Sequence, residues 1–137
     1  MDLVETQHGE NLVFTARVIG ADLSATPGLM VEIPMVSASP GHERLVYGLA
    51  LTSDNGKAWV QIIRQGNPPI NRGWFKLGAG VPYIRQMAPP FSVSILHPGE
   101  GLALGVSAEG QGDPSLPNLG VHVVVHSRKY QQNPTAT

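Results

Sequence analysis

Residues 121–126 read Val-His-Val-Val-Val-His. Val121, Val123 and Val125 recur at every second position, the spacing that places side chains on one face of a β-strand. β-branched residues also favour strands over helices. The stretch therefore predicts a strand with one buried face.

Similar short apolar runs recur along the chain, and none of them predicts a helix. Leu102, Leu104 and Val106, for example, alternate with small residues. Turn residues separate the runs: Asp54-Asn55-Gly56 favours a hairpin, and His97-Pro98-Gly99-Glu100 favours a type II turn. The expected strands cover residues 12–19, 29–36, 44–51, 57–64, 73–77, 81–85, 91–96, 101–108 and 119–127.

This number of short strands in 137 residues predicts one all-β domain. The expected fold is an antiparallel β-sandwich, jelly-roll-like, with about eight strands. An immunoglobulin-like sandwich, with Trp59 in a core strand, is the alternative. Within the single domain 1–137 we expect residues 1–11 to form an N-terminal arm and residues 131–137 a flexible tail.

Charge is sparse and unevenly distributed. Nine basic and ten acidic side chains make up 14% of the chain, against roughly 25% in an average domain. A surface this low in charge predicts contact with other molecules. Residues 1–56 carry seven acidic and two basic side chains, whereas residues 57–97 carry five basic and no acidic ones. The two blocks form complementary patches, or their strands interleave and the charges mix.

Several classes of protein are disfavoured. The chain has no cysteine, which excludes disulfides and thiolate chemistry. Its acidic start, Met1–Glu5, does not resemble a signal peptide, and no apolar run predicts a transmembrane segment. A net charge of −1 argues against a general nucleic-acid binder. We therefore expect neither a membrane nor a nucleic acid among the partners.

No group of residues predicts a reaction, a cofactor or a metal site. His122 and His126 lie four residues apart, which on a strand is about 13 Å and too far to share one ion. In a symmetric oligomer these two histidines would be the candidates to face the axis. A Gly-x-Ser-x-Gly nucleophile turn is absent. A pair of carboxylates for hydrolysis stays open, because any two of the ten acidic residues could meet in the fold.

The basic block, residues 57–97, contains many residues that are typical of protein interfaces. Trp, Tyr, Phe, Met and Arg are enriched in such surfaces. A plug of the sandwich core and a sugar-binding platform built on Trp74 and Tyr83 are the alternatives for the aromatic side chains. The candidate interface residues are Arg72, Trp74, Phe75, Tyr83, Arg85 and Met87.

The stretch from Phe91 to Tyr130 resembles the closing strands of small trimeric jelly rolls. Such modules occur in tumour-necrosis-factor-like and C1q-like proteins and in phage capsid decoration (cement) proteins. The last class implies a homotrimer at the capsid surface of a virion that binds the major capsid protein and stabilises the shell without being an enzyme. A carbohydrate-binding module or receptor-binding tip, with a sugar ligand, is the first alternative. A small β-fold hydrolase is the second.

Overall fold

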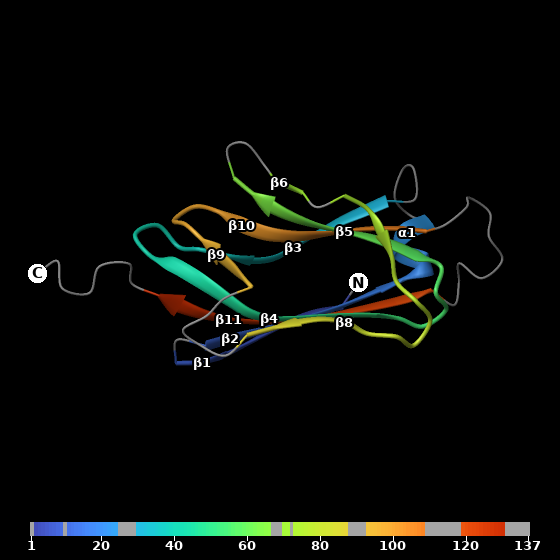
Figure 1. Cartoon of the computed structure of the whole chain (residues 1–137), viewed down its shortest axis with the longest axis horizontal. Coiled ribbons are helices and arrows are strands. Elements are labelled where there is room, and N and C mark those ends of the chain that lie inside the picture. Colours follow the sequence, from blue (N-terminus) through green and yellow to red (C-terminus); the bar gives the residue numbers. More distant parts are fainter. Residues whose placement is uncertain are drawn as a thin grey trace, which may run out of the picture.

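The computed structural model describes residues 2–9, 11–24, 30–66, 70–71, 73–87, 93–108 and 119–130. They form two antiparallel sheets packed face to face, which confirms the predicted β-sandwich (Figure 1). Sheet A has the order β1-β2-β11-β4-β8, with β9 also paired to β4, and sheet B has the order β3-β10-β5-β6, with β7 also paired to β5. The elements are β1 (Asp2–His8), β2 (Asn11–Ile19), α1 (Gly20–Ser24), β3 (Met30–Ser37), β4 (Glu43–Ser53), β5 (Ala58–Gln65), β6 (Ile70–Asn71), β7 (Phe75–Lys76), β8 (Tyr83–Gln86), β9 (Ser94–Leu96), β10 (Gly101–Ala108) and β11 (Gly120–Tyr130).

The strand order is that of a jelly roll. Early strands pair with late ones as in a long hairpin folded back on itself: β2 with β11, β3 with β10, β4 with β8 and β9, and β5 with β6 and β7. Rolling this hairpin places β11 beside β4 and β10 beside β5, which completes the two sheets. The chain therefore crosses repeatedly between the sheets, as it does in two linked Greek keys.

The alternating apolar residues face the space between the sheets. Val121, Val123 and Val125 are at most 1% exposed, as the repeat in residues 121–126 predicts. They pack against the inner faces of β2, β4 and β10, where Phe14, Leu51 and Leu104 are also buried. This shared core positions every surface that is considered below.

Two turns that the sequence predicts have different outcomes. The backbone N–H of Glu100 donates to the carbonyl of His97 at 2.9 Å, and Gly99 has φ of 82°, which agrees with a type II turn. Gly56 likewise has a positive φ of 68°. The predicted hairpin at Asp54–Gly56 is nevertheless wrong, because β4 belongs to sheet A and β5 to sheet B. The turn carries the chain across the sandwich.

Three elements lie outside the strands that the sequence predicts: α1, β1 and the two-residue strand β6. The one-turn helix α1 begins where Asp22 Oδ2 accepts a hydrogen bond from the backbone N–H of Ile19 at 2.8 Å, and it buries Leu23 completely. Residues 2–8, expected within an arm, form β1 and pair along their whole length with β2. The expected tail at 131–137 lies outside the described residues.

The acidic and basic blocks of the sequence interleave in space. Strands β5 and β8 come from the basic block, yet they pair with β10 and β4, which come from other blocks. Ion pairs also join different blocks, as between Arg64 and Glu100 at 2.8 Å. Within the described residues, no helix is long and apolar enough to cross a membrane.

Candidate functional site

The outer face of sheet A carries a continuous band without charged residues. Cross-strand neighbours share a face of the sheet, so the pairing register identifies the members of each row. Two adjacent rows cross all five strands from β1 to β8. We call these ten residues the uncharged band: Val4, Thr15, Val124, Ala50 and Ile84 in one row, and Thr6, Val13, His126, Gly48 and Gln86 in the other.

Charged residues lie on either side of the band. Asp2 and Arg17 begin the next row on one side, and Arg128 lies opposite Asn11 on the other side. The apolar ends of the band are well exposed, Val4 by 55% and Ile84 by 58%. At a strand spacing of about 4.8 Å, five strands make a surface about 19 Å wide. The two rows thus form a continuous surface without Asp, Glu, Lys or Arg across sheet A from β1 to β8.

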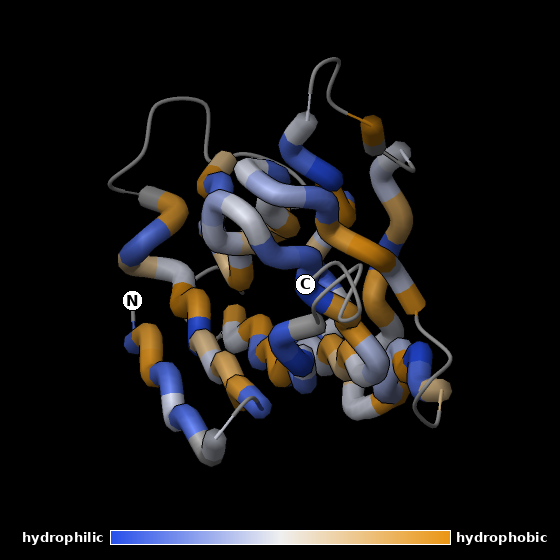
Figure 2. The backbone as a smooth tube through the Cα atoms, turned by 90° about the vertical axis from the view of Figure 1, so that its left-hand side faces the viewer, coloured by the Kyte–Doolittle hydropathy of each residue, from blue (hydrophilic) through white to orange (hydrophobic). Residues whose placement is uncertain are grey.

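Strand β1 is the exposed edge of the same sheet. Each side chain from Asp2 to Gln7 is exposed, on both faces of the strand. Leu3, opposite the buried Ala16, belongs to the inner face but is still 50% exposed. Sheet B therefore does not cover β1, which stands at one edge of the sandwich beside the N-terminal label (Figure 2). Hydrogen bonds to β2 hold this strand, and its other edge is unpaired within the described residues.

The structure separates the candidate interface residues into different places. Trp74 lies on the outer face of sheet B, where its Cη2 is 3.2 Å from the position that a Cβ on Gly105 would take. The half-buried rings of Phe75 and Tyr83 pack together with centroids 4.9 Å apart. Arg85 and Met87 are exposed, and Arg72 lies outside the described residues. Trp74 and Tyr83 do not build the shared platform that the sugar-binding interpretation requires.

His122 and His126 both lie on the outer face of sheet A, as a separation of four residues on a strand requires. His122 Nε2 is 3.3 Å from Asp54 Oδ1, whereas the His126 ring lies 6.0 Å from the ring of Tyr47. His126 belongs to the uncharged band and His122 to the charged row beside it. Among the described residues, no three His, Asp or Glu side chains are close enough to hold a metal ion.

A polar network that the sequence analysis missed lies at the β9–β10 turn. Glu100 Oε1 accepts hydrogen bonds from Arg64 Nη2 and from the backbone N–H of His97, both at 2.8 Å. These bonds, chiefly the one from Arg64, hold the pKa of Glu100 below its ordinary value. The buried Glu43 pairs through Oε1 with His97 Nδ1 at 2.8 Å. One signal was available: Arg64 continues the inward alternation of Val60 and Ile62, so it predicts a charge facing the interior.

Comparison with known proteins gives little beyond the fold described above. No family model and no curated protein matches the chain. One similar solved structure is a family two carbohydrate esterase from Cellvibrio japonicus, with 12% identity, a TM-score of 0.31, and coverage of 86% of this chain and 34% of the esterase chain. Another is the carbohydrate-binding module CBM36 in complex with calcium and xylotriose, with 10% identity, a TM-score of 0.29, and coverage of 94% and 92%. This chain thus spans about a third of the esterase, and neither similarity informs its function.

Proposed function

We propose that this chain is a virion structural protein of the capsid-decoration class, which assembles as a homotrimer and reinforces a protein shell. The observation that supports it is the outer surface of sheet A, where the uncharged band adjoins the exposed strand β1. Proteins normally protect a long edge strand by charge, by covering it or by pairing it. Here β1 has Asp2 and Glu5 for protection, but it also exposes Leu3 and Val4 by 50% and 55%.

In the proposed trimer, β1 of one copy packs against the uncharged band of the next. Such an edge-to-face contact is heterologous, and it closes into a ring of three copies when each copy is rotated by a third of a turn from the last. The area of the band, which is only two rows deep, is smaller than the roughly 800 Å² that each partner buries in a standard interface. It therefore forms the centre of the contact, while β1 and the exposed Met87 near β8 extend it. Burial of apolar area drives the association, at roughly 25 cal/mol per Å² before association costs.

Attachment to a shell needs a second surface on each copy. Trp74 on the outer face of sheet B is 40% exposed, and it remains available when sheet A is buried in the ring. Three such footprints in one trimer bind a symmetric shell with avidity, even where each footprint is weak. The expected partner is a major capsid protein, and we expect its gene to lie beside the gene for this chain. A neighbourhood of metabolic genes would contradict this part of the proposal.

Light scattering on a sizing column tests self-association. We expect a particle of three times the chain mass of 14.6 kDa. Val124→Lys places a charge at the centre of the band without touching the core, and it should yield monomers. Gln65→Lys is the matched control, because Gln65 is exposed on β5 of sheet B. A wild-type monomer at about 10 µM, or equal behaviour of the two variants, would contradict the trimer. A stable dimer would instead favour direct pairing between β1 edges.

A carbohydrate-binding module is the second candidate function. Its support in the structure is the exposed ring of Trp74, since sugars stack on such rings, while Tyr83 is turned toward the interior. A glycan array would show selective binding that is lost in Trp74→Ala and kept in Val124→Lys. Hydrolysis of glycans or esters by the purified chain would contradict both binding proposals.

A further inference from the structure

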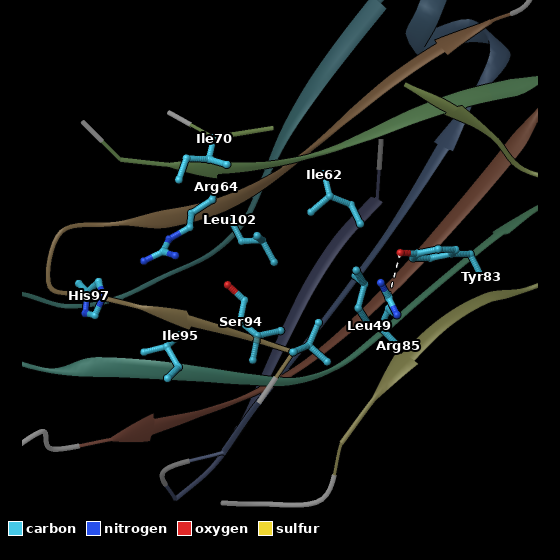
Figure 3. Close-up of a pocket in the computed structure, with 12 residues that line it drawn as sticks. Leu49, Ile62, Arg64, Ile70, Tyr83, Arg85, Ser94, Ile95, His97 and Leu102 are labelled. Atoms are coloured by element: carbon cyan, nitrogen blue, oxygen red, sulfur yellow. Dashed lines mark hydrogen bonds between the residues drawn. The ribbon is translucent and has the colours of Figure 1, made fainter. Parts of the chain in front are cut away.

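The edge of the sandwich opposite β1 contains a cavity between the two sheets. Its volume is about 480 Å³, within the range of sites that hold small molecules. Strands β5, β6 and β10 form one wall, and β4, β8 and β9 form the other (Figure 3). The cavity exists because the short strands β6, β8 and β9 close this edge incompletely. The residues that line it are Val46, Leu49, Ile62, Arg64, Ile70, Tyr83, Arg85, Val93, Ser94, Ile95, His97 and Leu102.

The interior of the cavity is apolar. Val46, Leu49 and Leu102 reach it from the core and are at most 4% exposed to solvent. Ile62 of sheet B also lines the cavity (Figure 3). Apolar walls favour an apolar ligand body and disfavour a sugar, whose many hydroxyl groups would lose their hydrogen bonds to water there. The polar side chains that line the cavity are those of Arg64, Tyr83, Arg85, Ser94 and His97, and polar groups in an apolar site fix the orientation of its ligand.

The charged groups of the cavity are both arginines, and the two differ in their partners. Arg64 enters from sheet B and is neutralised by Glu100 at 2.8 Å. Arg85 enters from sheet A opposite Leu49, at the other end of the cavity in Figure 3. Its Nε donates to Tyr83 Oη at 3.2 Å, and no carboxylate within the described part of the chain pairs with it. Among the described residues that line the cavity none is acidic, so Arg85 gives this lining a positive charge.

We infer that this cavity binds an amphipathic organic anion, a carboxylate attached to an unbranched apolar chain. The carboxylate pairs with the guanidinium of Arg85, which offers a planar fork of donors that matches a carboxylate. The apolar chain extends along Leu49, Ile62 and Leu102 between the sheets. The site lies on the inner side of sheet A, between the two sheets, whereas the proposed assembly uses the outer side of sheet A, so the inference goes beyond assembly and does not depend on it.

Isothermal titration with dodecanoate, below its micelle concentration, tests the site. We expect one molecule per chain, and binding that is weakened about tenfold or more in Arg85→Gln, because a charge-assisted hydrogen bond is lost. Arg17→Gln, on the outer face of sheet A, is the matched control and should bind as the wild type does. Dodecanol, with the same chain and no charge, should bind about tenfold more weakly than dodecanoate.

A second pair of variants tests the position of the apolar chain. Ile62→Trp fills the cavity and should abolish binding, whereas Ile63→Trp on the outward face of the same strand should not. Thermal unfolding of each variant shows whether it is folded. Equal binding by dodecanoate and dodecanol, equal effects of Arg85→Gln and Arg17→Gln, or no binding at about 1 mM would overturn the inference. The monomeric Val124→Lys variant should bind dodecanoate normally, which separates this site from the fate of the trimer.

Discussion

The two edges of sheet A differ in what they leave exposed. At the β1 edge, sheet A extends beyond sheet B, and a whole strand from Asp2 to His8 adds no buried side chain among its described residues. At the β8 edge, both sheets end in short strands that leave about 480 Å³ between them. A projecting strand offers backbone hydrogen bonds and a flat surface, which suit another protein. An apolar cavity with one cation that no described carboxylate pairs with suits a small anion.

Removal of residues 1–8, which deletes the β1 edge, is expected to have the largest effect on self-association. Without β1 the proposed ring loses one side of every contact, and the chain should remain monomeric at about 10 µM by sedimentation. The core should survive, because the side chains of residues 2–7 are exposed. Dodecanoate binding should be unchanged, since the cavity lies at the other edge. Loss of the cooperative unfolding transition in this variant would show that β1 is instead a structural part of the sandwich.

Truncation of one leucine at each edge tests how much that edge contributes to the free energy of unfolding. Leu102 at the cavity wall is 4% exposed, whereas Leu3 on β1 is 50% exposed. Leu102→Ala should lower the free energy of unfolding by about 2–4 kcal/mol, because it deletes buried methyl groups and enlarges the cavity. Leu3→Ala should lower it by about 0.5 kcal/mol or less. Urea unfolding in the monomeric Val124→Lys background measures both without a contribution from assembly. A cost at Leu3 equal to that at Leu102 would mean that β1 is covered within the single chain.

The same contrast explains how far the sequence predicts this molecule. Long strands with a buried face, such as β10 and β11, repeat apolar residues at every second position, and the prediction locates them closely. Strand β1 shows no such alternation, because neither of its faces is buried, so the apolar pattern does not predict it. Local signals also cannot say which sheet a strand joins. The chain does bend at Asp54–Gly56, where Gly56 has a positive φ, but long-range pairing of β4 with β11 and of β5 with β10 sends its two strands into different sheets.

The candidate sites were harder to predict for a related reason. The uncharged band collects ten residues from five strands, so it becomes visible only once the register is known. The block of residues 72–87 looked like one interface because its aromatic residues are close in sequence. In the fold, Trp74 lies on the outer face of sheet B while Tyr83 and Arg85 face the cavity. The inward position of Arg64, by contrast, follows from its phase with Val60 and Ile62.

The smallest expected effect concerns the charges at the two edges. Glu100→Gln should lower the free energy of unfolding by about 1 kcal/mol at pH 7, because it weakens the hydrogen bond from Arg64 near the cavity. Asp2→Asn on the exposed β1 should change it by about 0.3 kcal/mol or less.

Since the folded-state pKa of Glu100 lies below its ordinary value of 4.5, the unfolded chain takes up this proton first as the pH falls. The contribution of Glu100 is therefore complete above its ordinary pKa and is lost as the pH falls through the folded-state value. Urea unfolding of the two variants between pH 7 and about pH 3, again in the Val124→Lys background, should show the Glu100→Gln deficit shrinking toward acid while the Asp2→Asn value stays flat. A deficit that persists at the acid end would mean that the glutamine disturbs the packing of the β9–β10 turn, and that the ion pair with Arg64 contributes little to closing the cavity edge.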